Sequence, residues 1–137
     1  VKAFADAKAR LAPVLSPSER VALARWSAER VLAAAGEAPV YVACDDDSVA
    51  EWAVDHGAIV LWHPGVGLNA AVTDSVRDLR ERGVGHVVVA HGDLPRARDL
   101  LRVVIPGTVT LVPDVVGEFG DVEVGSDVLG EAAAPQK

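Results

Sequence analysis

The sequence contains no methionine and a single cysteine, Cys44, among its 137 residues. One cysteine excludes an internal disulfide and a zinc cluster built from cysteines. Because Cys44 ends an apolar run, we expect it to be a small buried side chain. The chain begins at Val1 without an initiator methionine, as a fragment or a processed product does. Its first structural element is therefore expected to be incomplete.

The chain also lacks long hydrophobic stretches and an excess of positive charge. Hydrophobic residues make up 50% of the chain, but no apolar run approaches the roughly 18 residues that cross a bilayer, and no signal-peptide pattern opens it. Thirteen Lys and Arg against twenty Asp and Glu give a net charge of -7, which argues against a nucleic-acid backbone as partner. We therefore expect a cytoplasmic protein that binds neither membranes nor nucleic acids.

The length is that of a single domain. A chain of this size buries roughly 68% of its unfolded surface, which is enough for a hydrophobic core. We expect one domain over residues 1–130. The last residues, 131–137, are rich in alanine and end in Pro135, Gln136 and Lys137, so a disordered tail is predicted there.

Short apolar segments alternate with helical patterns along the chain. Strands are predicted at residues 40–44, 58–62, 87–90 and 109–112. Helices are predicted at residues 17–35, 48–55, 69–82 and 96–104, the first of them after a capping box at residues 16–19. Right-handed crossovers between such strands give a parallel sheet. The predicted fold is α/β, with a mostly parallel sheet between two layers of helices.

Asp93 follows the predicted strand at residues 87–90, a run of apolar residues without charge, and lies two residues before Pro95. Ligands in parallel α/β sheets collect beyond the carboxyl ends of the strands, which is where this acid falls. A carboxylate at such a place can bind Mg²⁺, which takes one or two protein carboxylates plus phosphate oxygens. Alternatively, Asp93 caps the following helix, with Pro95 in its first turn. The spacing alone leaves both interpretations open.

Three cations stand close together in the opening stretch, namely Lys2, Lys8 and Arg10. They form either a cradle for phosphates or an ordinary solvated basic face. The acids at residues 45–47 follow the strand at residues 40–44, and capping of the next helix is the favoured interpretation over metal binding.

A glycine-rich loop at residues 65–69 leads into the third helix. Gly65 and Gly67 permit close approach of the backbone to a ligand, and the start of a helix offers free amides to an anion or a base. The same glycines also suit an ordinary strand-to-helix turn. Asn69 is either the N-cap of the helix or a hydrogen-bonding group that faces the ligand.

Four motifs in collinear order carry a resemblance to a known family. They are Val-Lys-Ala-Phe-x-x-Ala-Lys-x-Arg-Leu at positions 1–11, Gly-x-Gly-Leu-Asn-x-Ala at 65–71, His-Gly-Asp-Leu-Pro at 91–95 and Thr-Leu-Val-Pro-Asp at 110–114. Together they resemble the 2-phospho-L-lactate guanylyltransferase family (CofC, or FbiD in actinobacteria). The resemblance implies a nucleotide-diphospho-sugar transferase fold of the glycosyltransferase-A type. It also implies transfer of GMP from GTP to 2-phospho-L-lactate or phosphoenolpyruvate, with release of pyrophosphate, in the biosynthesis of deazaflavin coenzyme F-420. A composition rich in Ala, Val, Asp and Arg suits the actinobacterial branch, for which phosphoenolpyruvate is the implied acceptor.

The resemblance also assigns roles to individual residues. It implies a triphosphate site formed by Lys2, Lys8 and Arg10. It implies a guanosine site formed by Gly67 and Asn69. It also implies a Mg²⁺ site at Asp93 and an acceptor site at Ser126. Lys8 and Asp93 are the implied catalytic residues. Because the transfer brings anions together, the protein must supply cations, a metal ion and alignment, and it needs no nucleophilic side chain.

The resemblance further suggests that the domain is truncated at both ends. The family has a hydrophobic strand before the segment that starts at Val1, and an acceptor-binding segment and a later metal-binding acid beyond the last residue of this chain. A sheet with its opening strand cut away is expected to recruit a partner, so we predict self-association. The alternative functions are a non-catalytic nucleotide-binding or structural remnant of the fold, and another sugar or molybdopterin nucleotidyltransferase.

Overall fold

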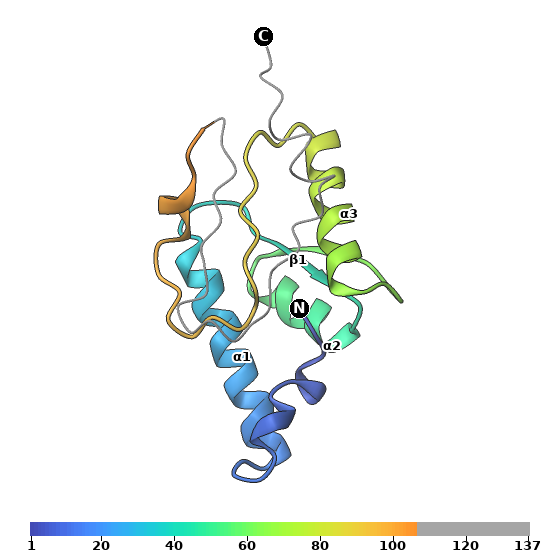
Figure 1. The fold of residues 1–137 in the computed structure, drawn as a ribbon, viewed down its shortest axis with the longest axis vertical. Coiled ribbons are helices and arrows are strands. Elements are labelled where there is room, and N and C mark those ends of the chain that lie inside the picture. The colour runs from blue at the N-terminus through green and yellow to red at the C-terminus, as the bar shows by residue number, and fades with distance from the viewer. Residues whose placement is uncertain (107–137) are drawn as a thin grey trace.

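The computed structural model describes residues 1–106, in which helices and strands alternate (Figure 1). The elements in chain order are the 3-10 helices η1 (Phe4–Asp6) and η2 (Ala9–Leu11), then α1 (Pro17–Ala34), β1 (Tyr41–Cys44), α2 (Asp47–Asp55), β2 (Ile59–Trp62), α3 (Leu68–Glu81) and the 3-10 helix η3 (Leu100–Val103). The first three predicted helices and the first two predicted strands are therefore confirmed. In this part of the chain no helix is long and apolar enough to cross a membrane.

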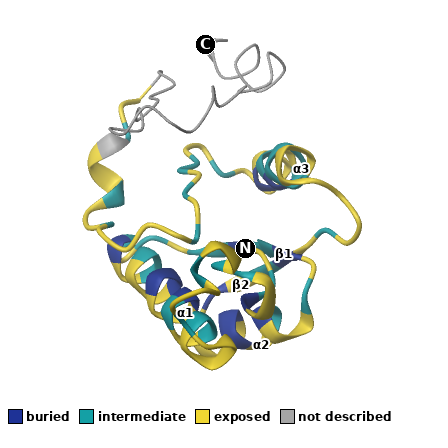
Figure 2. Ribbon diagram, turned by 60° about the horizontal axis from the view of Figure 1, so that its bottom comes forward, coloured by how far each residue is buried: buried dark blue, intermediate teal, exposed yellow. Residues whose placement is uncertain are grey.

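The two strands form a parallel sheet in which α2 is the crossover. Their register pairs Tyr41 with Ile59 and Cys44 with Trp62. In Figure 2 the strands lie between α3 on one side and α1 and α2 on the other. This is the α/β arrangement that the alternating pattern predicts, with the carboxyl ends of both strands at the same edge.

The longest helix, α1, begins at the predicted capping box. The Ser16 hydroxyl accepts a hydrogen bond from the Glu19 backbone N–H at 3.3 Å, and the Glu19 carboxylate accepts one from the Ser16 N–H at 2.7 Å. Pro17 occupies the first turn, where its missing N–H costs nothing. After the helix, Gly36 has a φ of 59°, the left-handed conformation that glycine adopts without strain.

The hydrophobic core lies between the sheet and the helices α1 and α2. Phe4, from the opening stretch, packs edge-to-face on Trp52 with ring centroids 5.3 Å apart. Val42 and Cys44 of β1 and Val49 of α2 complete this part of the core. Cys44 is 5% exposed, so its predicted burial is confirmed. Burial raises the pKa of its thiol, which is therefore not a reactive thiolate.

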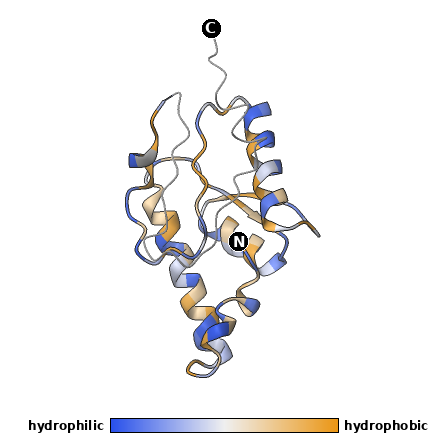
Figure 3. Ribbon diagram, viewed as in Figure 1, coloured by the Kyte–Doolittle hydropathy of each residue, from blue (hydrophilic) through white to orange (hydrophobic). Residues whose placement is uncertain are grey.

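The predicted strand at residues 87–90 is wrong. Residues 84–90 have no regular secondary structure and pair with no strand, since within residues 1–106 β1 and β2 pair only with each other. The segment is hydrophobic, as Figure 3 shows, yet Val89 remains 57% exposed. An apolar sequence favours a strand, but hydrogen bonding to a neighbouring strand decides whether one forms.

The predicted helix at residues 96–104 is also wrong, since this region contains only the short η3. Asp99 precedes η3 and makes no side-chain capping bond, so the start of a longer helix has no support there. The predicted strand at residues 109–112, the end of the predicted domain at residue 130 and the predicted tail at residues 131–137 lie outside the described residues.

Candidate functional site

Lys8 and Asp93, both predicted site residues, contact each other directly. The Lys8 ammonium donates a hydrogen bond to the Asp93 carboxylate and forms an ion pair with it. The Lys8 side chain is 18% exposed, whereas that of Asp93 is 60% exposed. The pair therefore has one face toward the protein and one accessible to a ligand.

The backbone at Lys8 is unusual. Its φ of 58° and ψ of 29° lie in the left-handed region, and within residues 1–106 it is the only non-glycine residue with a positive φ. This conformation costs a residue with a side chain roughly 1–2 kcal/mol. Strain of this kind concentrates at functional sites, where the surrounding structure holds it in place. Here it directs the Lys8 side chain toward Asp93.

The opening stretch meets the turn at residues 91–95 near the carboxyl end of β1. The Val1 amino group donates a hydrogen bond to the Ala43 carbonyl oxygen. A Cβ added to Gly92 would lie 3.0 Å from Val1 Cγ2, so Gly92 permits this close approach. Burial lowers the pKa of the Val1 ammonium, whereas the negative charge of nearby Asp45 opposes that shift. The candidate site therefore adjoins the end of a parallel strand, where ligands of open α/β sheets bind.

The interpretation of Asp93 as a helix cap is wrong. The next helical element, η3, begins at Leu100 and is preceded by Asp99. The Asp93 carboxylate instead accepts a hydrogen bond from Lys8. At the neighbouring strand the capping interpretation is confirmed, because Asp46 accepts a hydrogen bond from the Val49 N–H at 3.1 Å at the start of α2.

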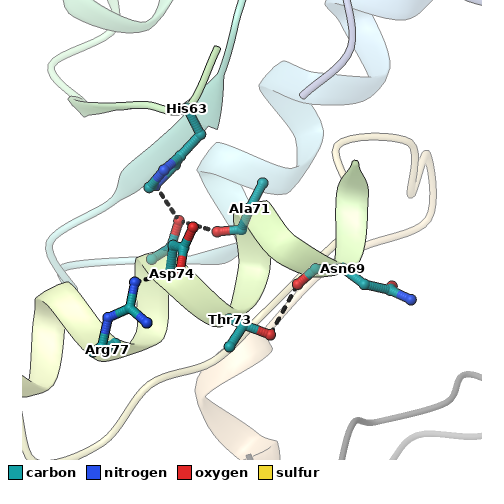
Figure 4. Close-up of polar contacts among 7 residues, drawn as sticks. His63, Asn69, Ala71, Thr73, Asp74 and Arg77 are labelled. Atoms are coloured by element: carbon teal, nitrogen blue, oxygen red, sulfur yellow. Dashed lines mark hydrogen bonds and ion pairs between the residues drawn. The ribbon is translucent and has the colours of Figure 1, made fainter. Parts of the chain in front are cut away.

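The glycine loop leads to an uncapped start of α3. The N-cap residue is Gly67, which has no side chain to accept from the first amides, so the N-cap interpretation of Asn69 is wrong. The Asn69 carboxamide makes no hydrogen bond within residues 1–106, and Figure 4 shows it pointing away from His63. Its backbone carbonyl accepts from the Thr73 hydroxyl at 2.9 Å. The helix start and the Asn69 amide are thus both available to a ligand.

His63 connects the loop to its surroundings, and the sequence pattern gave it no role of its own. Its backbone N–H donates to the Cys44 carbonyl at 3.0 Å, at the end of β1. Its Nε2 lies 3.0 Å from the hydroxyl of Ser75 in α3. A histidine directly before Pro64 and Gly65 is the only sequence signal, and it does not indicate the distant serine.

The remaining predicted residues are not joined to the Lys8–Asp93 pair. Lys2, Arg10, Gly67 and Asn69 are all exposed, and no hydrogen bond or ion pair in the described part of the chain links them to it. Ser126 lies outside the described residues. The structure thus brings together two of the predicted residues and places four others, Lys2, Arg10, Gly67 and Asn69, on accessible surface.

A metal ion would find one carboxylate at this site. Among residues 1–106 no group of three or more His, Cys, Asp or Glu side chains lies close enough to hold a metal. Mg²⁺ needs fewer protein ligands, because it usually keeps waters and takes phosphate oxygens as well. The exposed Asp93 carboxylate therefore fits Mg²⁺ together with a bound nucleotide, and does not form a metal site by itself.

Comparison with known proteins identifies the family. The sequence model of the family described as "Guanylyl transferase CofC like" matches residues 1–105. The chain belongs to this CofC-like family. The match includes the Lys8–Asp93 pair and the glycine loop, so both candidate features lie in the part of the chain that defines membership.

Two curated relatives of this CofC-like chain are each named phosphoenolpyruvate guanylyltransferase. The protein from Rubrobacter xylanophilus is 36% identical over 121 residues, which cover 86% of this chain and 56% of the relative. The protein from Sphaerobacter thermophilus is 35% identical over 99 residues, which cover 69% of this chain and 48% of the relative. The chain thus spans about half the length of the curated relatives it matches.

Proposed function

We propose that the chain acts in a guanylyltransferase that joins GMP from GTP to phosphoenolpyruvate or 2-phospho-L-lactate, with release of pyrophosphate, in coenzyme F-420 biosynthesis. The observation that carries the proposal is the Lys8–Asp93 pair, which places a cation and an exposed carboxylate at one point within the region that matches the family. Both named relatives act on phosphoenolpyruvate according to their names, which favours that acceptor.

The reaction requires the charges that this site offers. A phosphate oxygen of the acceptor attacks the α-phosphorus of GTP and forms a new P–O bond. The bond from the α-phosphorus to the bridging oxygen of the β-phosphate breaks, and its electron pair leaves with pyrophosphate. Because acceptor and donor are both anionic, cations must offset their repulsion and align them. We assign this role to Lys8, supported by Lys2 and Arg10.

Asp93 is the proposed Mg²⁺ ligand. When bound, Mg²⁺ would neutralise phosphate charge and favour departure of pyrophosphate. In the structure the Asp93 carboxylate already has a cationic partner, the Lys8 ammonium. This pair holds the carboxylate ready for a second cation and keeps Lys8 close to where the phosphates would lie.

The glycine loop is the proposed guanosine site. The uncapped start of α3 presents backbone N–H groups, and the exposed Asn69 carboxamide offers both a donor and an acceptor. Such a pair can match the edge of guanine, which also presents donors and acceptors. Gly67 has no Cβ, so a nucleoside can approach its backbone closely.

A GTP-dependent transferase of this kind is proposed to work in the cytoplasm, and self-association remains part of the proposal. The test has two stages. Calorimetric titration with GTP and Mg²⁺ should show binding that is tighter than for ATP. A pyrophosphate-release assay should then show turnover with phosphoenolpyruvate or 2-phospho-L-lactate. Absence of GTP binding would refute the proposal, and binding without turnover would support the non-catalytic alternative instead.

A further inference from the structure

We propose that His63 is a positioning residue that clamps the glycine loop onto α3 through Ser75, and so prepares the loop to receive the guanosine part of the nucleotide. The inference rests on the proposed function, because it concerns the same loop. His63 is not among the site residues predicted from the sequence. Its proposed role concerns binding of the guanosine part, whereas the proposed cations bind the phosphates.

The geometry of the clamp joins both ends of the loop. His63 directly follows β2, and its backbone N–H is held by the Cys44 carbonyl at 3.0 Å. Its imidazole Nε2 lies 3.0 Å from the Ser75 hydroxyl, twelve residues further along the chain in α3. Figure 4 shows the His63 ring beside the first turns of α3. The loop at residues 64–67 is therefore closed by a side-chain hydrogen bond between the two elements that it connects.

The hydrogen-bond network assigns the proton of this contact. The Ser75 hydroxyl donates its single hydrogen to the Ala71 carbonyl at 2.7 Å. Its oxygen must then accept from His63, so the Nε2 atom carries the hydrogen. Ser75 is 8% exposed, which shields this contact from water. If His63 is removed, the Ser75 hydroxyl keeps its bond to Ala71, so the helix stays intact while the loop loses its tie.

Nothing else in the described part of the chain secures the loop in this way. Residues 64–69 are all exposed. Gly65 has a φ of 71°, and a Cβ at Gly65 or Gly67 would meet no atom within 4 Å. A loop without packing loses conformational entropy when it binds a ligand. A loop that is already held in place loses less of it on binding. The clamp should therefore strengthen binding without touching the nucleotide.

The test compares His63→Ala, Ser75→Ala and the double variant. Each should weaken binding of guanosine and of GTP by the same factor, about five- to tenfold, which is the range for one partly buried hydrogen bond. The double variant should lose no more than either single variant, because all three break the same contact. His63→Gln places an amide donor near the position of Nε2 and should restore most of the affinity.

Arg77→Ala is the matched control. Arg77 also lies in α3, two residues after Ser75, and its side chain donates a hydrogen bond to the Asp74 carboxylate, a contact within the helix that does not reach residues 64–69. This variant should bind guanosine like the unchanged protein. Hydrogen exchange gives a second readout, in which the backbone amides of residues 65–69 exchange faster in His63→Ala and Ser75→Ala than in Arg77→Ala.

The outcomes separate the clamp from the proposed function. If the unchanged protein binds neither GTP nor guanosine, the proposed function fails, and hydrogen exchange still decides whether the clamp orders the loop. If the unchanged protein binds GTP and His63→Ala binds it equally well, the clamp is refuted. Additive losses in the double variant, or an equal loss in Arg77→Ala, would likewise overturn it.

Discussion

The Lys8 ammonium donates a hydrogen bond to the Asp93 carboxylate, 85 residues further along the chain. The two residues flank most of the described structure, so their contact depends on the intervening helices and strands being folded. The Lys8 residue that makes this contact has a left-handed backbone, with a φ of 58°. The contact brings the proposed phosphate-binding cation beside the proposed Mg²⁺ ligand.

Replacement of Asp93 by Asn should separate activity from stability. Because the Asp93 side chain is 60% exposed and caps no helix, loss of its ion pair should change the free energy of unfolding by less than about 1 kcal/mol. Pyrophosphate release should fall on the order of 100-fold, the scale expected for losing one stabiliser of developing charge. Mg²⁺-dependent GTP binding should also be lost.

Asp99→Asn is the control for this substitution. Asp99 is also 60% exposed and also pairs with a cation, since its carboxylate lies 3.9 Å from Arg102 Nε. The control should leave both pyrophosphate release and Mg²⁺-dependent GTP binding unchanged. Equal effects of the two substitutions in calorimetry and in the assay would remove Asp93 from the proposed metal site.

Replacement of Lys8 by Ala should weaken GTP binding more than guanosine binding. Only GTP carries the phosphates that this cation is proposed to meet, so its dissociation constant should rise about tenfold or more while that of guanosine stays the same. Calorimetry with both ligands measures the difference. Arg30→Ala removes a cation that stacks on Trp26 in α1, outside the proposed site, and should affect neither ligand. Arg10→Ala is expected to act like Lys8→Ala if Arg10 also meets the phosphates.

The strain at Lys8 predicts an order of stability among variants. Lys8→Gly and Lys8→Ala both lose the ion pair, but only glycine adopts the left-handed backbone without a steric penalty. Lys8→Gly should therefore unfold with a free energy about 1 kcal/mol above that of Lys8→Ala in chemical denaturation. A less stable Lys8→Gly would show that the backbone at this residue is not strained.

Asp46 should make stability depend on pH. The Ser48 hydroxyl, and after it the backbone N–H groups of Val49 and Ser48, lower the pKa of the Asp46 carboxyl. A lowered folded pKa stabilises the fold at every pH above the unfolded value of about 4, and this contribution disappears as pH falls through the folded pKa. Asp46→Asn keeps a capping oxygen without the charge. It should therefore be less stable than the unchanged protein at pH 7 and equally stable at strongly acidic pH.

Asp46→Ala removes the cap itself and should cost about 1 kcal/mol at pH 7. The control is Asp45→Ala, since the neighbouring Asp45 is exposed and does not cap α2. Urea denaturation of the three variants at both pH values provides the measurement. A pH dependence that persists in Asp46→Asn would assign the effect to another carboxylate.

Self-association should appear as a mass above that of the monomer in light scattering at micromolar concentration. Within residues 1–106 the two strands pair only with each other, and β2 carries Ile59 at 47% and Trp62 at 46% exposure. Strand edges that have no pairing neighbour recruit partners, and a lysine placed on an edge strand prevents this. Ile59→Lys should shift the mass to that of a monomer. A monomeric mass for the unchanged protein would contradict the prediction.

Local sequence determined the elements whose signals lie within a few residues of one another. The capping box at Ser16 and Glu19 fixed the start of α1, because both partners belong to the same turn. The cap at Asp46 and the apolar runs of β1 and β2 are also local features, and the structure confirms them. The family could likewise be predicted from short motifs, since motif order along the chain is a property of sequence alone.

Tertiary structure decided the features that depend on distant neighbours. Residues 87–90 have the composition of a strand but pair with none in the described part of the chain, because strand formation needs a partner that composition does not supply. Asp93 was equally suited to capping and to a site until the fold placed Lys8 beside it. The tie between His63 and Ser75 left no sequence signal for the same reason. Contacts across the fold form only where the backbone brings the side chains together, and that placement is set by the packing of the whole domain.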